Sequence, residues 1–212
     1  MSLLPETRIY VVDDDAAVRD SIALLLSFHG YRVVEFESAE AFLAAWQPGW
    51  SGCVLLDLRL SGMDGLALQS ELVRRHSVLP IIFLTGHGDV ADARQALRQG
   101  ATDFLEKPID KQALLSAVTE ALDRAVQLRE AEAHKTDILS RIERLTDRER
   151  QVLERVVVGR QNRDIAAELS ISPRTVEVFK ARMMEKMQAR SVADLIRMWL
   201  SSGLAVEDHL AF

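Results

Sequence analysis

Short apolar runs alternate with amphipathic stretches along the first half of the chain. Each run is rich in Val, Ile, Leu or Phe and has the length of a strand, and each stretch repeats its apolar residues at helical spacing. Strands and helices that alternate in this way predict an α/β fold, a five-stranded doubly wound parallel sheet with helices on both faces. The predicted strands are Ile9–Val12, Arg32–Phe36, Val54–Leu56, Ile81–Leu84 and Asp103–Leu105, and the predicted helices are Ala16–Phe28, Ala39–Trp46, Leu66–His76, Val90–Arg98 and one that begins at Lys111.

The last part of the chain predicts only helices. Thr146 to Glu149 is a capping box, in which the threonine hydroxyl and the glutamate satisfy free amides at a helix start. Ser172 and Pro173 start a later helix as its N-cap and first residue. The tight link 170–172 between two short helices predicts a helix-turn-helix. The expected helices run from the capping box to near Gly159, over Arg163–Leu169, from Pro173 onward, and over Val192–Leu200 with a stop at Gly203.

A long helical pattern without Gly or Pro connects the two halves. We assign residues 1–125 to a first domain, 126–144 to a helical linker and 145–212 to a four-helix second domain. Two interpretations of the linker stay open. It is either the frayed end of the last helix of the first domain, or a helix that pairs with a second chain.

Composition is typical of a soluble globular protein, with 48% hydrophobic and 27% charged residues among 212. The chain has no uncharged apolar run of about 18 residues, and its start lacks the features of a signal peptide. We therefore expect a cytoplasmic protein without a membrane partner. The single cysteine, Cys53, lies in an apolar run and is expected to be a packed core thiol.

The net charge of −6 is unevenly distributed. Residues 1–125 carry 11 Lys and Arg against 18 Asp and Glu, which gives −7, whereas residues 145–212 carry 11 against 10, which gives +1. Within 160–190 the count is 7 against 4. The acidic total therefore does not exclude nucleic-acid binding, but places any such binding in the C-terminal part.

Polar residues follow four of the five predicted strands. Asp13 and Asp14 end the first strand and Asp57 ends the third, at the sheet edge where ligands bind. Crowded carboxylates repel one another unless a cation lies among them, and Mg²⁺ suits such oxygen ligands. Thr85 ends the fourth strand and Lys107 follows the fifth. Singly, such residues are often only helix caps. Together they indicate phosphoryl transfer, in which Asp57 attacks while the cation, the lysine and the hydroxyl bind the phosphoryl oxygens.

These motifs resemble the receiver domains of two-component response regulators over about residues 6–125. The similarity lies in Val-Val-Asp13-Asp14-Asp, Leu-Leu-Asp57-Leu-Arg, Phe-Leu-Thr85-Gly and Glu-Lys107-Pro108. The resemblance implies that Asp57 is the phosphoacceptor and that Thr85 and Lys107 complete the active site.

The same resemblance implies that Asp14, Asp57 and the Arg59 carbonyl bind Mg²⁺, with Asp13 acting largely through water. It makes Thr85 and Phe104 the switch residues. Ser61 stands where the family usually has proline. We expect this departure to make its loop more mobile without the loss of a catalytic group.

The C-terminal motif, from Leu145 through Asn162 and Ile165 to Val176, resembles the LuxR-type helix-turn-helix. Together the halves are similar to response regulators of the NarL/FixJ type, and the Ser-Pro-Arg-Thr-Val-Glu-Val run is most similar to the FixJ branch. Phe179 departs from the histidine usual in that branch, so we expect altered packing or an altered backbone contact there.

The resemblance implies a transcription factor that a sensor histidine kinase phosphorylates. The phosphorylated form is expected to be a homodimer that binds paired half-sites in double-stranded promoter DNA, with RNA polymerase as a further candidate partner. Its own catalysis would be limited to its phosphorylation and dephosphorylation. The sequence leaves open the cognate kinase and signal, the promoter, activation or repression, and the lifetime of the phosphoryl group.

The helix that starts at Pro173 has one apolar face, formed by Val176, Met183 and Met187, which is expected to pack on the domain. The N-terminal part of the opposite face would enter the major groove. Glu177 can accept from cytosine there, and Lys180 and Arg182 are interpreted as phosphate contacts or solvated charges. The expected DNA-binding residues are Arg174, Thr175, Glu177, Val178, Lys180, Ala181 and Arg182.

Two other functions compete with this hypothesis. An aspartate-nucleophile phosphatase also places an Asp-x-Asp pattern at a strand end, but it needs a further acidic pair after the lysine strand, where only Asp110 follows nearby. A degenerate receiver that merely dimerises would incorporate no phosphate.

Overall fold

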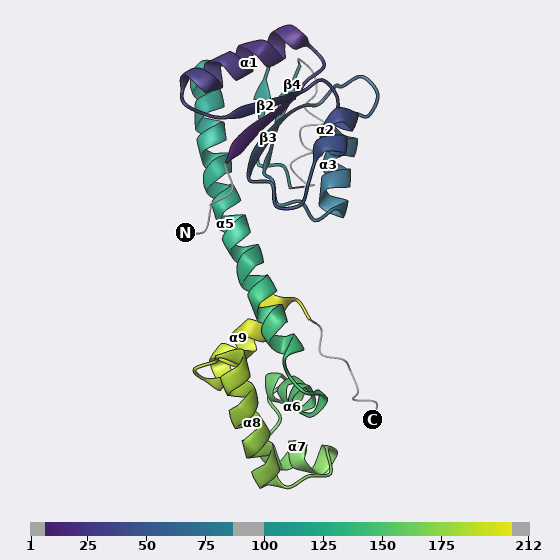
Figure 1. Cartoon of the computed structure of the whole chain (residues 1–212), viewed down its shortest axis with the longest axis vertical. Coiled ribbons are helices and arrows are strands. Elements are labelled where there is room, and N and C mark those ends of the chain that lie inside the picture. Colours follow the sequence, from purple (N-terminus) through teal and green to yellow (C-terminus); the bar gives the residue numbers. More distant parts are fainter. Residues whose placement is uncertain (1–6, 87–99, 205–212) are drawn as a thin grey trace. The chain divides into compact units, whose positions relative to one another are not determined.

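The computed structural model describes residues 7–86 and 100–204, and the chain divides into two compact units, Met1–Arg129 and Glu130–Phe212 (Figure 1). The first unit holds a parallel sheet with the order β2-β1-β3-β4-β5. The doubly wound α/β fold predicted from the sequence is thus confirmed. The strands are β1 (Arg8–Val12), β2 (Val33–Phe36), β3 (Gly52–Asp57), β4 (Ile81–Thr85) and β5 (Asp103–Glu106).

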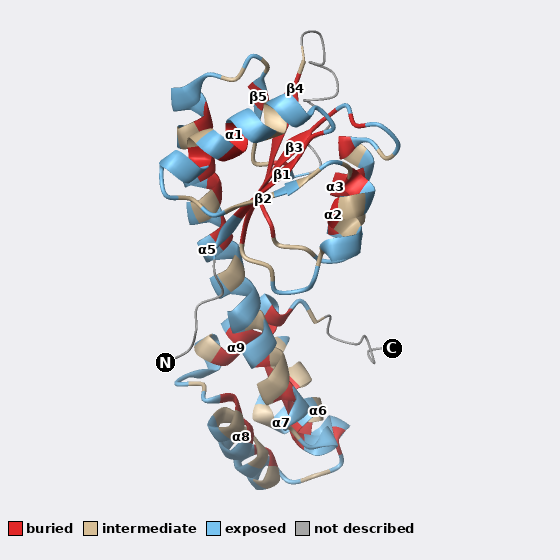
Figure 2. Cartoon of the chain, turned by 45° about the horizontal axis from the view of Figure 1, so that its top comes forward, coloured by how far each residue is buried: buried red, intermediate tan, exposed pale blue. Residues whose placement is uncertain are grey.

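Helices cover both faces of this sheet, and alternate strand residues point to opposite faces. Ile9 and Val11 of β1 pack with α1 and α5, whereas Tyr10 and Val12 pack with α2 and α3. Because both faces are covered, the central strands are buried throughout (Figure 2) and read as continuous apolar runs in the sequence. The helices are α1 (Ala16–Phe28), α2 (Ala39–Ala45), α3 (Gly65–Arg74) and α5 (Lys111–Glu143).

The second unit is helical and has a core of its own. The end of α5 contributes Ile138 and Ile142 to this core, where they pack with Trp199 among others. Between the two short elements of the helix-turn-helix, Ser170 adopts a φ of 54°, which reverses the chain in a tight turn. The helices are α6 (Asp147–Val157), α7 (Asn162–Glu168), α8 (Pro173–Met187) and α9 (Val192–Ser202).

Several local predictions are confirmed. The Thr146 hydroxyl and the Glu149 carboxylate form the capping box of α6, and Gly203 ends α9 in the left-handed conformation. Cys53 is a buried free thiol, and burial raises its pKa to about 12. The predicted helix Val90–Arg98 lies outside the described residues. No helix of the described ranges is both long and apolar enough to cross a membrane.

Candidate functional site

Three aspartates meet at the carboxyl edge of the sheet. Asp13 and Asp14 directly follow β1 and Asp57 ends β3, and the parallel register pairs Val12 with Leu56. One oxygen from each of the three carboxylates lies within 4.8 Å of the other two. Asp13 is fully buried, Asp57 is 7% exposed and Asp14 is exposed. The strand ends therefore gather the acidic residues as the sequence analysis expected.

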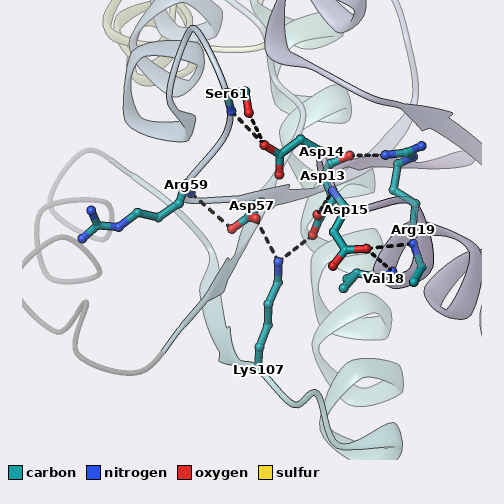
Figure 3. A network of polar contacts seen from close by, with 10 residues as sticks. Asp13, Asp14, Asp15, Val18, Arg19, Asp57, Arg59, Ser61 and Lys107 are labelled. Carbon is teal, nitrogen blue, oxygen red and sulfur yellow. Dashed lines mark hydrogen bonds and ion pairs between the residues drawn. The ribbon is translucent and has the colours of Figure 1, made fainter.

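Lys107 lies between two of these carboxylates (Figure 3). Its Nζ donates to Asp13 Oδ2 at 2.7 Å and to Asp57 Oδ2 at 2.9 Å. The residue follows β5, and its backbone N–H donates to the Thr85 carbonyl at 2.7 Å, which fixes the root of the side chain. The positive charge of Lys107 thus reaches the acidic cluster from the end of β5, which lies two strands from β3 in the sheet.

Short local hydrogen bonds hold the aspartates in place. Asp13 Oδ1 accepts from the Asp15 N–H at 2.9 Å, and the Asp13 carbonyl accepts from Arg19 Nη1 at 2.7 Å. Asp57 Oδ1 accepts from the Arg59 N–H at 3.2 Å, while the Arg59 side chain extends away from the cluster (Figure 3). Backbone amides therefore hold the oxygens of Asp13 and Asp57 that Lys107 does not contact.

Burial and crowding set the protonation tendencies of the site. Burial raises the pKa of Asp57, and the hydrogen bond from Lys107 offsets this only in part. Burial lowers the pKa of Lys107, but its hydrogen bonds to Asp13 and Asp57 outweigh that effect, so the pKa is raised overall and the ammonium stays charged. The carboxyl edge thus favours additional positive charge near Asp57.

A contact that sequence reasoning missed ties Ser61 to Asp14. Asp14 Oδ2 accepts from the Ser61 backbone N–H at 3.0 Å and from its hydroxyl at 2.5 Å. The hydrogen bond from the Ser61 hydroxyl is the largest cause of a lowered pKa for Asp14. A cavity of about 370 Å³ opens beside this pair, with Arg59 and Asp64 also in its lining. The only signal in the sequence was the serine at a position where proline is usual.

The two predicted switch residues, Thr85 and Phe104, lie on β4 and β5. Thr85 ends β4 and is 5% exposed, and β4 pairs with β3, which carries Asp57. Phe104 lies in β5 with 43% of its surface exposed. The three carboxylates supply hard oxygen donors, which fit a divalent cation such as Mg²⁺.

In the second unit, α8 carries the residues that the sequence predicts as DNA contacts. Its predicted packing face is confirmed, because Val176, Met183 and Met187 are fully buried. Phe179 packs partly buried against the same core. The exposed residues of α8 that were named as DNA contacts are Arg174, Glu177, Val178, Ala181 and Arg182, whereas Thr175 and Lys180 are half-buried.

Two polar contacts organise this helix. Arg174 Nη1 donates to Glu177 Oε2 at 2.9 Å on the exposed face. Lys180 Nζ donates to Asn162 Oδ1 at 3.1 Å and so links α8 to the first residue of α7. The helix-turn-helix therefore carries a charged pair on its outer face and a lysine at its flank.

Comparison with known proteins matches both units to families. Residues 9–119 match the response regulator receiver domain, and residues 143–199 match the bacterial regulatory proteins of the luxR family. The transcriptional regulatory protein FixJ of Bradyrhizobium diazoefficiens is 45% identical over 93% of this chain and 96% of its own length.

Solved structures extend this likeness to the fold. The response regulator StyR has a TM-score of 0.74 at 37% identity, over 92% of this chain and 98% of its own. Full-length FixJ from B. japonicum has a TM-score of 0.57 at 44% identity, over 95% of this chain and 99% of its own. These relatives are regulators, so the phosphatase alternative is set aside. The chain belongs to the two-component response regulators of the NarL/FixJ type, phosphorylation-dependent transcription factors with a receiver domain and a LuxR-type DNA-binding domain.

Proposed function

We propose that Asp57 accepts a phosphoryl group from a sensor histidine kinase and that this event controls DNA binding by α8. The observation that carries the proposal is the Asp57 carboxylate, 7% exposed, with Lys107 Nζ at 2.9 Å and two further aspartates beside it. A nucleophilic carboxylate, a fixed cation and further acidic oxygens are the parts that phosphoryl transfer needs.

In the proposed step, an Asp57 oxygen attacks the phosphorus of a phosphohistidine. A P–O bond forms as the P–N bond breaks, and the histidine nitrogen leaves with the bonding pair. Lys107 stays protonated and neutralises phosphoryl oxygens, and the Thr85 hydroxyl donates to one of them. Asp14, Asp57 and the Arg59 carbonyl would hold Mg²⁺ and Asp13 would act through water. When bound, the cation neutralises charge on the transferring group. The receiver would catalyse only its own phosphorylation and dephosphorylation.

The proposed switch consists of Thr85 and Phe104. Phosphorylation adds up to about two negative charges and new acceptor oxygens, toward which Thr85 would move. Phe104, exposed in this structure, would turn inward, and the receiver would then pair with a second copy. Such a change is a population shift, so phosphorylation needs to favour the paired form by only a few kcal/mol.

We assign the DNA contacts to α8. We also propose that the chain consists of three segments with different functions. Residues 1–125 form the phosphoacceptor domain, 126–144 the linker and 145–212 the DNA-binding domain. Arg174, Glu177, Val178 and Ala181 would face base edges, and Thr175, Lys180 and Arg182 the backbone. The partners are the kinase, promoter DNA with paired half-sites, a second copy of the chain and RNA polymerase, in the cytoplasm.

Phosphorylation of the purified chain with acetyl phosphate and Mg²⁺ tests this function. Intact mass should show one added phosphoryl group on the wild type and none on Asp57→Asn, with the fold of the variant unchanged by circular dichroism. Asp14→Ala should lose Mg²⁺ binding at little cost in stability, because Asp14 is exposed. Normal labelling of Asp57→Asn would overturn the assignment. Absence of label on the wild type would favour the degenerate receiver.

A further inference from the structure

The loop between β3 and α3 contacts the acidic cluster through Ser61. Both donors of this residue, its backbone N–H and its hydroxyl, reach the same oxygen, Asp14 Oδ2, at 3.0 and 2.5 Å. The two residues are 47 positions apart in the chain. This contact therefore joins the loop after β3 to the loop after β1 at the carboxyl edge of the sheet.

Asp14 needs such an anchor more than its neighbours do. Asp13 is fully buried and Asp57 is 7% exposed, so packing restricts their side chains, whereas Asp14 is exposed. An exposed carboxylate rotates among several rotamers and must lose that freedom when it binds a cation. With Oδ2 held by Ser61, the other carboxylate oxygen of Asp14 lies on the side of Asp57 (Figure 3).

The residue type matters because proline, which is usual at this position in receiver domains, has neither donor. Proline lacks a backbone N–H and a side-chain hydroxyl, so it cannot form either hydrogen bond to Asp14. The serine of this chain therefore adds two contacts to a carboxylate that faces the cation position.

We propose that Ser61 is a positioning residue for Mg²⁺: it fixes the Asp14 carboxylate so that its second oxygen is ready to bind the cation. The inference rests on the proposed function, since it assumes that Asp14 is a ligand. Hydrogen bonds to a metal-binding carboxylate orient it, and their removal commonly weakens metal binding about tenfold or more.

Isothermal titration of MgCl₂ into the unphosphorylated full-length chain tests this role. Ser61→Ala removes the hydroxyl and keeps the N–H, Ser61→Thr keeps both donors, and Ser61→Pro removes both. We expect the Mg²⁺ dissociation constant to rise about tenfold in Ser61→Ala and to change less than about twofold in Ser61→Thr. Ser61→Pro should bind Mg²⁺ no more tightly than Ser61→Ala does. Ser70→Ala is the matched control, because Ser70 is an exposed serine of α3 whose hydroxyl donates to the Leu66 carbonyl of its own helix.

A second readout separates positioning from catalysis. The Mg²⁺ concentration that gives half-maximal labelling by acetyl phosphate should rise in Ser61→Ala, while the labelling rate at saturating Mg²⁺ stays near that of the wild type. Equal or tighter Mg²⁺ binding by Ser61→Ala, with a wild type that binds Mg²⁺, would overturn this inference alone. A wild type that binds no Mg²⁺ would overturn both it and the proposed metal site. If Ser61→Pro does not fold, the Ala and Thr variants decide.

Discussion

Lys107 supplies the positive charge beside two carboxylates that burial crowds together. Its Nζ lies 2.7 Å from Asp13 and 2.9 Å from Asp57, and its side chain is 23% exposed. Removing one partner of a buried ion pair leaves uncompensated charge, which commonly costs about 3 kcal/mol. The lysine therefore has a structural role in addition to its proposed part in phosphoryl transfer.

We expect Lys107→Met to lower the free energy of unfolding by about 3 kcal/mol in metal-free buffer at pH 7. Millimolar Mg²⁺ should restore much of this loss, because a cation that binds only the folded state stabilises it and replaces the missing charge. Urea unfolding followed by circular dichroism, with and without MgCl₂, measures both quantities.

Lys111→Met is the control, since Lys111 is exposed at the start of α5. It should change stability by less than about 0.5 kcal/mol. An equal loss in both variants, or a loss in Lys107→Met that Mg²⁺ does not reduce, would mean that Lys107 does not balance the acidic cluster.

At the residue scale, the sequence could predict which side chains meet but not how the loops join them. Asp13, Asp57 and Lys107 converge because each ends or follows a strand of one parallel sheet, and strand ends can be read from apolar runs. The pairing of Ser61 with Asp14 depends on the path of an irregular loop. No spacing rule relates two residues in separate loops, so only the structure shows that contact.

Element boundaries follow the same division between local and non-local causes. Ala16–Phe28 begins and ends as predicted because its signals are local. The third helix was predicted as Leu66–His76 but runs over Gly65–Arg74. Asp64 caps its start by accepting from the Ala67 N–H, and His76 adopts a φ of 55°, which a continuing helix cannot contain. The strand order depends on crossovers between distant elements, and apolar runs alone do not specify it.

The start of α6 depends on one buried carboxylate. Glu149 is 3% exposed, and it accepts from the Thr146 N–H at 2.8 Å and from Lys186 Nζ at 2.6 Å. Burial alone would raise the pKa of Glu149, but these hydrogen bonds outweigh burial, and the pKa is lowered overall. A group whose pKa is lower in the folded state stabilises the fold above its unfolded pKa and loses that contribution as the pH falls.

We therefore expect Glu149→Gln to be less stable than the wild type by about 1 to 2 kcal/mol at pH 7. The variant keeps a cap acceptor but loses the charge opposite Lys186. The difference should persist down to the ordinary carboxyl pKa of 4.5 and shrink as the pH falls below it. Thermal unfolding between acidic and neutral pH checks this. A difference that does not depend on pH would show that the ionised form is not what stabilises the cap.

The proposed DNA contacts of α8 lead to a prediction about base selection. Glu177→Ala should relax the preference at one base position per half-site, because an acceptor for a base edge contributes about 1 to 3 kcal/mol of discrimination. Lys180→Ala should weaken binding to all sequences alike and reduce the salt slope by about one unit. Selection from random duplexes, followed by salt titration, distinguishes these effects. An unchanged motif in Glu177→Ala with an altered one in Lys180→Ala would mean that the helix enters the groove differently.

At the scale of the whole molecule, two separately packed units share one helix. α5 contributes Leu114 and Val118 to the core between the sheet and α1. It contributes Ile138 and Ile142 to the core of the second unit. The 3–4 spacing of apolar residues near each end predicts a helix. It does not show that Ile138 and Ile142, which lie in the segment 126–144 assigned to the linker, pack in the core of the second unit. One helix thus holds residues of both cores.

If two chains associate, the gain in DNA affinity should depend on whether the duplex carries two half-sites. A single helix-turn-helix contacts few base pairs, so specificity needs two copies on a paired site. If phosphorylated receivers pair, binding of the second half-site becomes intramolecular, and affinity for a paired site rises without any new DNA contact. A duplex with one half-site and a scrambled second half offers no such gain.

We therefore expect phosphorylation to tighten binding to the paired site by about a hundredfold. Binding to the single half-site should change by less than about twofold, because the contacts of one copy of α8 stay the same. Fluorescence anisotropy on duplexes of equal length measures both affinities, with sedimentation at the same protein concentrations to follow the mass. Asp57→Asn treated with acetyl phosphate should show neither the gain in affinity nor the gain in mass. Equal gains on both duplexes would mean that phosphorylation acts within one chain, by releasing α8 from an inhibitory contact, and pairing would then not be the source of the control.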